Sequence, residues 1–143
     1  MELEATLEHG FMGAAGQGRF TPAARADYAE AAAAVLTDHA HATNVAYELG
    51  GDEALTMDEM AALLSEAAGQ RIANTNMPAE RYAAGLVRAG LPEPVAHVLA
   101  DASAAIALGE LATSSGDLQR LLGRPSTAVD RTFKLALASE VLA

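Results

Sequence analysis

The chain has 143 residues, enough for one hydrophobic core, and we expect residues 1–143 to form a single domain. Its formal net charge of −10, with only nine scattered Lys and Arg residues, excludes a basic surface for DNA or RNA. The sequence has no cysteine, no apolar run near the roughly 20 residues of a membrane span and no basic-then-apolar leader, so we expect a cytoplasmic protein without disulfides or a membrane partner.

The N-terminal part is predicted to contain short helices joined by a glycine-rich loop. Residues 2–9 predict a short helix, and residues 10–18 hold four glycines, typical of a loop that approaches other backbone or a ligand closely. Pro22 then favours an edge or irregular extended segment. A helix is predicted from Asp27 to Leu36, and Asp27 suits its N-cap or first turn, where a carboxylate meets free N–H groups.

The middle of the chain is predicted to hold two strands around a well-capped helix. Alternation over residues 45–49 (Val-Ala-Tyr-Glu-Leu) predicts a half-buried strand. Thr56 and Glu59 form a T-x-x-E capping box, which predicts the start of a helix with one apolar face. Gly69 suits a left-handed C-cap of that helix, and residues 71–76 predict a weak further strand.

The C-terminal half is predicted to be helical. Helices are expected over residues 78–90, from Pro92 or Pro94 to Gly109, over 117–122, and after a cap at Thr127. The second has a stripe at helical spacing, formed by Val95, Val98, Leu99, Ala102 and Ile106. The last is predicted to turn inward Val129, Phe133 and Leu137. With about three short strands and about six helices, the chain is predicted to be a helix-rich α/β protein.

The glycine-rich loop is the first candidate for chemistry, as a phosphate-binding turn. A dinucleotide site needs G-x-G-x-x-G between a strand and a helix. Here Gly13, Gly16 and Gly18 stand in a different order, and the loop leads into an extended segment. We therefore interpret the loop as a structural or cleft-lining turn.

Metal binding and tyrosine-based acid catalysis are weakly supported. His39 and His41 could share a metal, but they need further ligands, and Asp38 alone is adjacent, so a solvated loop is the simpler interpretation. The only lysine, Lys134, has no tyrosine four residues before it, so the Tyr-x-x-x-Lys pair of typical short-chain dehydrogenases is absent. We predict no catalytic residue and no metal ligand in this chain.

Substrate contact is predicted at Phe11, Met12 and Tyr82. Phe11 and Met12 lie between glycines, where an apolar pair could form a wall for a flat, quinone-like ligand or a plug into the core. Tyr82 is also predicted to contact substrate, and the competing interpretation of this tyrosine is a packing residue that keeps a wet hydroxyl. The adjacent carboxylate pairs Asp52–Glu53 and Asp58–Glu59 diverge in direction and are interpreted as solvated surface.

Five short motifs together resemble a known family. They are Ala24-Arg-Ala-Asp-Tyr-Ala, Tyr47-Glu-Leu-Gly-Gly, Leu55-Thr-Met-Asp-Glu, Ala89-Gly-Leu-Pro and Leu122-Gly-Arg-Pro-Ser-Thr. In this order they resemble the C-terminal, substrate-side half of the NmrA-like, atypical short-chain dehydrogenase/reductases, which include NAD(P)H:quinone oxidoreductases. The resemblance implies the C-terminal portion of a Rossmann-type fold. It also implies a parent activity of hydride transfer from NAD(P)H to a quinone-like, electrophilic acceptor.

In that family the dinucleotide is held by a glycine-rich loop upstream of the matching region, which this sequence does not contain. We therefore expect that this chain alone binds no NAD(P)H and is inactive alone as a reductase. The alternative is a non-enzymatic binding or regulatory module, because NmrA-like relatives include redox-sensing regulators. Strand edges and apolar faces left without that half would predict a homo-oligomer, or pairing with a separate N-terminal half.

Overall fold

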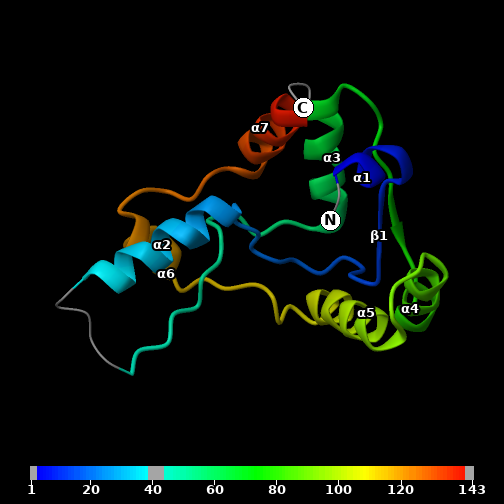
Figure 1. Ribbon diagram of the computed structural model, residues 1–143, viewed down its shortest axis with the longest axis horizontal. Helices are drawn as coiled ribbons and strands as arrows, with labels where there is room; N and C mark the ends of the chain where they lie inside the picture. Colours follow the sequence, from blue (N-terminus) through cyan, green and yellow to red (C-terminus); the bar gives the residue numbers. More distant parts are fainter. Residues whose placement is uncertain (1–2, 39–43, 141–143) are drawn as a thin grey trace.

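The protein is described by a computed structural model over residues 3–38 and 44–140. Within these ranges it forms seven α-helices and one two-stranded parallel sheet, and no helix there is long and apolar enough to cross a membrane (Figure 1). In chain order the elements are α1 (Leu3–His9), β1 (Phe11–Gly13), α2 (Arg25–Thr37), α3 (Met57–Ala68), β2 (Asn74–Asn76), α4 (Ala79–Arg88), α5 (Glu93–Ala107), α6 (Asp117–Leu122) and α7 (Val129–Glu140). The predicted helix-rich α/β class is confirmed.

Helices associate in three pairs, α3 with α7, α4 with α5, and α2 with α6, which Figure 1 shows in three separate parts of the molecule. The main hydrophobic core lies at the first pair. It consists of Phe11, Met60, Ala61, Leu64, Ile72 and Phe133. The predicted inward residues of α7 contribute to it, since Val129 and Leu137 pack against this cluster beside Phe133.

Local signals fix the bounds of α3 as predicted. The backbone N–H of Glu59 donates to Thr56 Oγ1 at 3.2 Å, and the N–H of Thr56 donates to Glu59 Oε2 at 2.8 Å. Both halves of the capping box are therefore formed. Gly69 ends the helix with φ of +65°, a left-handed conformation that glycine adopts without steric cost.

The sheet is smaller than the sequence predicts. β1 pairs in parallel with β2, so that Phe11 lies opposite Asn74 and Gly13 opposite Asn76. The strand predicted over residues 45–49 is wrong, because this segment pairs with no other strand. Its backbone binds side chains instead: the N–H of Glu48 donates to Asp117 Oδ2 at 2.9 Å. Alternation alone could not reveal that the partner would be a helix terminus rather than a strand.

The apolar stripe predicted on α5 does not face the interior. Ala96 and Ala100 are buried against α4, whereas Val98 is 67% exposed and Val95 and Leu99 are also exposed. Alanines let the two helices approach closely, and the larger residues are consequently left outside. The segment is helical as predicted, but the buried face of α5 is the one that carries Ala96 and Ala100, beside the predicted stripe.

Candidate functional site

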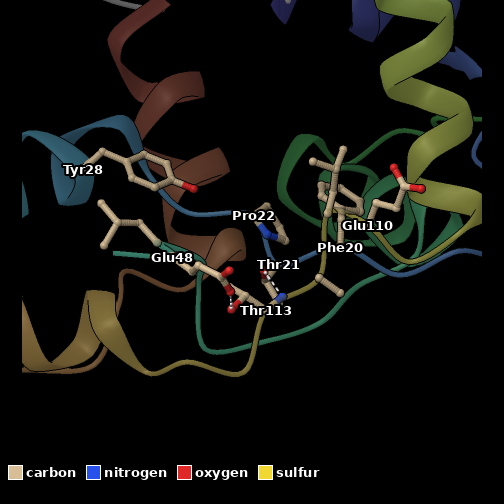
Figure 2. Close-up of a pocket in the computed structure, with 10 residues that line it drawn as sticks. Phe20, Thr21, Pro22, Tyr28, Glu48, Glu110 and Thr113 are labelled. Carbon is tan, nitrogen blue, oxygen red and sulfur yellow. Dashed lines mark hydrogen bonds between the residues drawn. The ribbon is translucent and has the colours of Figure 1, made fainter. Parts of the chain in front are cut away.

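The candidate site is an open cleft of about 380 Å³ between α2 and the linker that follows α5. Three stretches of chain far apart in sequence form its walls (Figure 2). They contribute Phe20, Thr21, Pro22 and Tyr28, then Glu48 and Leu49, and finally residues 110–113. Half of these side chains are apolar and the others carry a hydroxyl or a carboxylate, so the cleft offers both apolar and polar contacts to a small organic ligand.

Hydrogen bonds among the lining residues hold the three stretches together. Thr113 donates its backbone N–H to Thr21 Oγ1 at 3.3 Å and its hydroxyl to Glu48 Oε2 at 3.2 Å (Figure 2). The backbone N–H of Thr21 donates to the carbonyl of Leu111 at 3.1 Å. Thr113 therefore joins both other walls, and the polar edge of the cleft is fixed before any ligand binds.

A buried carboxylate connects α2 to the segment before α7. Asp27 is 1% exposed and accepts hydrogen bonds from the Thr127 N–H at 2.6 Å, the Thr127 hydroxyl at 3.0 Å and the Arg124 guanidinium at 2.9 Å. Burial acts to raise the pKa of Asp27, but the hydrogen bonds from Thr127 and Arg124 outweigh it and leave the pKa below its usual value. We call Asp27, Arg124 and Thr127 the carboxylate latch.

The contacts of Asp27 and Thr127 differ in two respects from those predicted at the starts of α2 and α7. Asp27 lies in the first turn of α2, as predicted, yet the N–H group that it binds belongs to Thr127 and not to its own helix. Thr127 was predicted to cap α7, but α7 begins at Val129, which places Ala128 at the cap position. Asp27 and Thr127 thus bind each other and join two distant segments of the chain, instead of capping their own helices.

Three of the five motifs that carry the family resemblance lie together beside the cleft. Beside the latch, Gly51 donates its N–H to the Thr21 carbonyl at 3.0 Å. Asp52 and Ser126 bind each other twice, through Asp52 N–H to Ser126 Oγ at 3.0 Å and Ser126 N–H to Asp52 Oδ2 at 2.8 Å. Residues 24–29, 47–51 and 122–127 thus form one assembly. Tyr28, Glu48 and Leu49 of the cleft were missed as site residues, although they stand inside the quoted motifs.

The glycine-rich loop serves the fold and does not fit a phosphate group. Ala14 donates its N–H to Ser103 Oγ at 2.8 Å, and Gly16 donates its N–H to Asn76 Oδ1 at 2.8 Å. The N–H of Gly18 is bound by the Ala15 carbonyl at 2.9 Å. A phosphate cradle requires free N–H groups at a helix N-terminus. The glycine-rich loop follows β1, but the non-helical residues 19–24 separate it from α2, so the loop does not lead directly into a helix N-terminus that could bind a phosphate group.

The three predicted substrate contacts are not brought together at the cleft. Phe11 is buried in the main core, which matches the interpretation as a plug. Met12 points to the other face of β1 and is 52% exposed, and Tyr82 is half-buried on α4. None of the three lines the cleft. Their contact with substrate stays a prediction.

The remaining candidates are placed as follows. Lys134 pairs with Asp130 at 2.9 Å, both on α7, and does not line the cleft to which Tyr28 belongs. Within the described part of the chain, no three His, Asp or Glu side chains are grouped so that they could hold a metal. His39 and His41 lie outside the described residues.

In sequence and fold the chain is similar to the C-terminal part of the NmrA-like short-chain dehydrogenase/reductases, in agreement with the resemblance that the motifs indicate. No family model matches the chain. In particular, it is homologous to quinone oxidoreductase 2 of Escherichia coli (strain K12), with 42% identity over 126 residues, 87% of this chain and 44% of the relative.

Solved structures agree with this assignment. A crystal structure of the NADPH-dependent quinone oxidoreductase QOR2 from Escherichia coli, complexed with NADPH, superposes with a TM-score of 0.87 and 38% identity, over 94% of this chain and 47% of that one. The triphenylmethane reductase of Citrobacter sp. gives a TM-score of 0.82 and 36% identity, over 94% of this chain and 46% of that one. The chain spans somewhat less than half the length of these relatives.

Proposed function

We propose that this chain is the substrate-binding portion of an NAD(P)H-dependent quinone-type oxidoreductase, and that by itself it binds the acceptor without reducing it. The observation that carries the proposal is the cleft of about 380 Å³, whose apolar walls and few fixed polar groups suit a flat aromatic molecule. Phe20, Pro22 and Leu111 would contact the rings of the acceptor, with Tyr28 at the side.

The chain's own residues would bind and orient the acceptor, while the hydride donor would be held elsewhere. Homology to NADPH-dependent enzymes supports NAD(P)H as that donor. The hydrogen bonds from the N–H groups of the glycine-rich loop to Ser103 and Asn76 support the view that this chain alone does not hold the donor. A non-enzymatic binding module would use the same cleft, and it differs in having no turnover even when a nucleotide-binding half is supplied.

Menadione binding, followed by NMR of the ¹⁵N-labelled chain, tests the proposal. We expect saturable shifts of amide signals at Thr21, Leu49 and residues 110–113, which line the cleft. Ala112→Phe would fill the cleft and weaken binding about tenfold, which corresponds to about 1.4 kcal/mol. Ala62→Phe, on the exposed face of α3, is the matched control and should bind as the unmodified chain does. Shifts centred on Met12 and Tyr82, or none at all, would contradict the cleft assignment.

A further inference from the structure

Tyr28 brings to the cleft a hydroxyl that is available to a ligand. This tyrosine lies half-buried on α2 among the lining residues, and its hydroxyl forms no hydrogen bond with another residue of the described ranges. No buried side-chain oxygen or nitrogen in those ranges lacks a hydrogen-bond partner, so this hydroxyl is open to solvent. It can therefore bind a molecule that enters the cleft without first breaking a bond inside the protein.

The other polar side chains of the cleft are engaged with one another or cannot donate. The Thr113 hydroxyl donates to Glu48 Oε2 at 3.2 Å, and Thr21 Oγ1 accepts from the Thr113 N–H at 3.3 Å. Ionised carboxylates such as those of Glu48 and Glu110 accept hydrogen bonds and carry no donor hydrogen. Among the lining hydroxyls in the described part of the chain, that of Tyr28 alone takes part in no hydrogen bond.

The carboxylate latch fixes the direction in which Tyr28 points. Asp27 precedes it on α2 and is held by Arg124 and Thr127, which sets the rotation of the first helical turn. Successive residues of an α-helix are about 100° apart around the axis, so Tyr28 leaves the helix in another direction. Figure 2 shows its ring directed into the cleft, with the hydroxyl at the end toward Pro22. With only two side-chain torsions, a tyrosine placed in this way binds a ligand at a low cost in conformational entropy.

We propose that Tyr28 orients the acceptor by donating a hydrogen bond from its hydroxyl to a carbonyl oxygen of that molecule. This inference rests on the proposed function, namely that the cleft binds a quinone-like acceptor. Quinone carbonyls accept hydrogen bonds but donate none, and a carbonyl that leaves water without a new donor lowers the affinity. The phenol of Tyr28 supplies such a donor, whereas the two carboxylates do not. The carbonyl would therefore lie beside Tyr28, and the rings would pack on Phe20 and Pro22.

Two ligands that differ in their carbonyl groups test this role: menadione, and 2-methylnaphthalene, which has the same ring system and methyl group without the carbonyls. Both are titrated into the ¹⁵N-labelled chain and into Tyr28→Phe, and dissociation constants are obtained from the amide shifts of the cleft residues. We expect Tyr28→Phe to weaken menadione binding about threefold to tenfold, the range for one neutral hydrogen bond. Its affinity for 2-methylnaphthalene should stay unchanged, because the ring that packs on the ligand is retained.

Tyr82→Phe is the matched control, and the carbonyl of bound menadione gives a second measurement. Tyr82 is also half-buried but lies on α4 and does not line the cleft, so loss of its hydroxyl should leave both affinities unchanged. In menadione labelled with ¹³C at its carbonyls, a hydrogen bond from Tyr28 should move one carbonyl resonance downfield. Tyr28→Phe should remove that shift and Tyr82→Phe should retain it, whereas a residue that only packs against the rings would not affect this resonance.

The outcomes separate this inference from the proposed function. If menadione binds in the cleft but Tyr28→Phe weakens both ligands equally, or neither, the inference is overturned and the proposed function stands. A loss of menadione affinity in Tyr82→Phe as large as in Tyr28→Phe would also overturn the inference. If menadione shifts no signal of the cleft residues, the proposed function is overturned, together with the inference that rests on it.

Discussion

Replacing Asp27 with alanine is expected to lower the free energy of unfolding by about 3 kcal/mol, measured by urea denaturation followed by circular dichroism. The substitution removes a carboxylate that is 1% exposed and leaves the partly buried N–H of Thr127 without its acceptor. It also removes one of the two carboxylates that Arg124 binds in the described ranges and leaves the more exposed one, Glu30. Because the latch joins α2 to the segment before α7, the walls of the cleft should lose their fixed positions at the same time.

Glu30→Ala is the matched control for this variant. Glu30 binds the same guanidinium but is 52% exposed, and a solvated ion pair contributes about 0.5 kcal/mol or less. If both variants cost the same, burial of Asp27 would not be the source of its effect. A loss of unfolding free energy below about 1 kcal/mol in Asp27→Ala would contradict a stabilising role of the carboxylate latch.

The difference in unfolding free energy between the unmodified chain and Asp27→Ala should depend on pH, because the pKa of Asp27 is lowered in the folded state. A carboxylate whose pKa is lower in the folded state than its unfolded value of about 3.9 stabilises the fold above that value, and the stabilisation is lost as the pH falls through the folded pKa. The difference in stability between the unmodified chain and Asp27→Ala should therefore be complete at pH 7 and shrink below about pH 4.

Gly18→Ala is expected to destabilise the chain by about 3 kcal/mol or more in the same denaturation assay. A Cβ atom at this position would lie closer than 3.0 Å to backbone atoms of Ile106 and Ala107 on α5. Backbone cannot move aside as a flexible side chain can, so the loop would have to separate from the helix. The expected loss reflects the structural role of the glycine-rich loop.

Gly85→Ala is the contrasting variant, since a Cβ there meets only the end of the Arg88 side chain at 3.9 Å and the residue lies inside α4. We expect it to stabilise the chain by about 0.5–1 kcal/mol, the usual gain for alanine over glycine in a helix. A Gly18→Ala variant as stable as the unmodified chain would show that the loop does not need a close approach to α5. It would reopen the interpretation of the loop as a ligand site.

Elements governed by neighbouring residues were predictable from the sequence. The Thr56–Glu59 capping box and the left-handed Gly69 set the ends of α3 as expected, and α6 spans Asp117–Leu122 as predicted. In each case the signal and the structure it specifies lie within a few residues of each other. The order of the five motifs was sufficient to predict the family and the fold class.

Features that depend on distant partners were not predictable in the same way. The segment at residues 45–49 alternates like a strand but binds Asp117 and Ser115, which lie more than sixty residues further along the chain. The stripe at Val95, Val98 and Leu99 has helical spacing, yet alanines decide which face of α5 packs on α4. Self-association of the chain stays a prediction, and the exposed stripe on α5 is an apolar surface through which two copies would pack.

The cleft itself required the structure, because its three walls come from segments that no spacing rule connects. Tyr28 lies in the first motif and Glu48 in the second, but only the folded structure shows that both line the same cleft. The candidate residues chosen from composition, Phe11 and Met12, belong to a strand instead, where alternation turns one inward and the other outward.

We propose that this chain binds the acceptor but cannot by itself use NADPH to reduce it. The most direct measurement is the absorbance of the nicotinamide band when NADPH and menadione are mixed with the 143-residue chain. We expect the band to decay no faster than it does without protein, at any chain concentration. A decay that accelerates in proportion to the concentration of the chain would contradict the claim and show that these residues alone form a complete reductase.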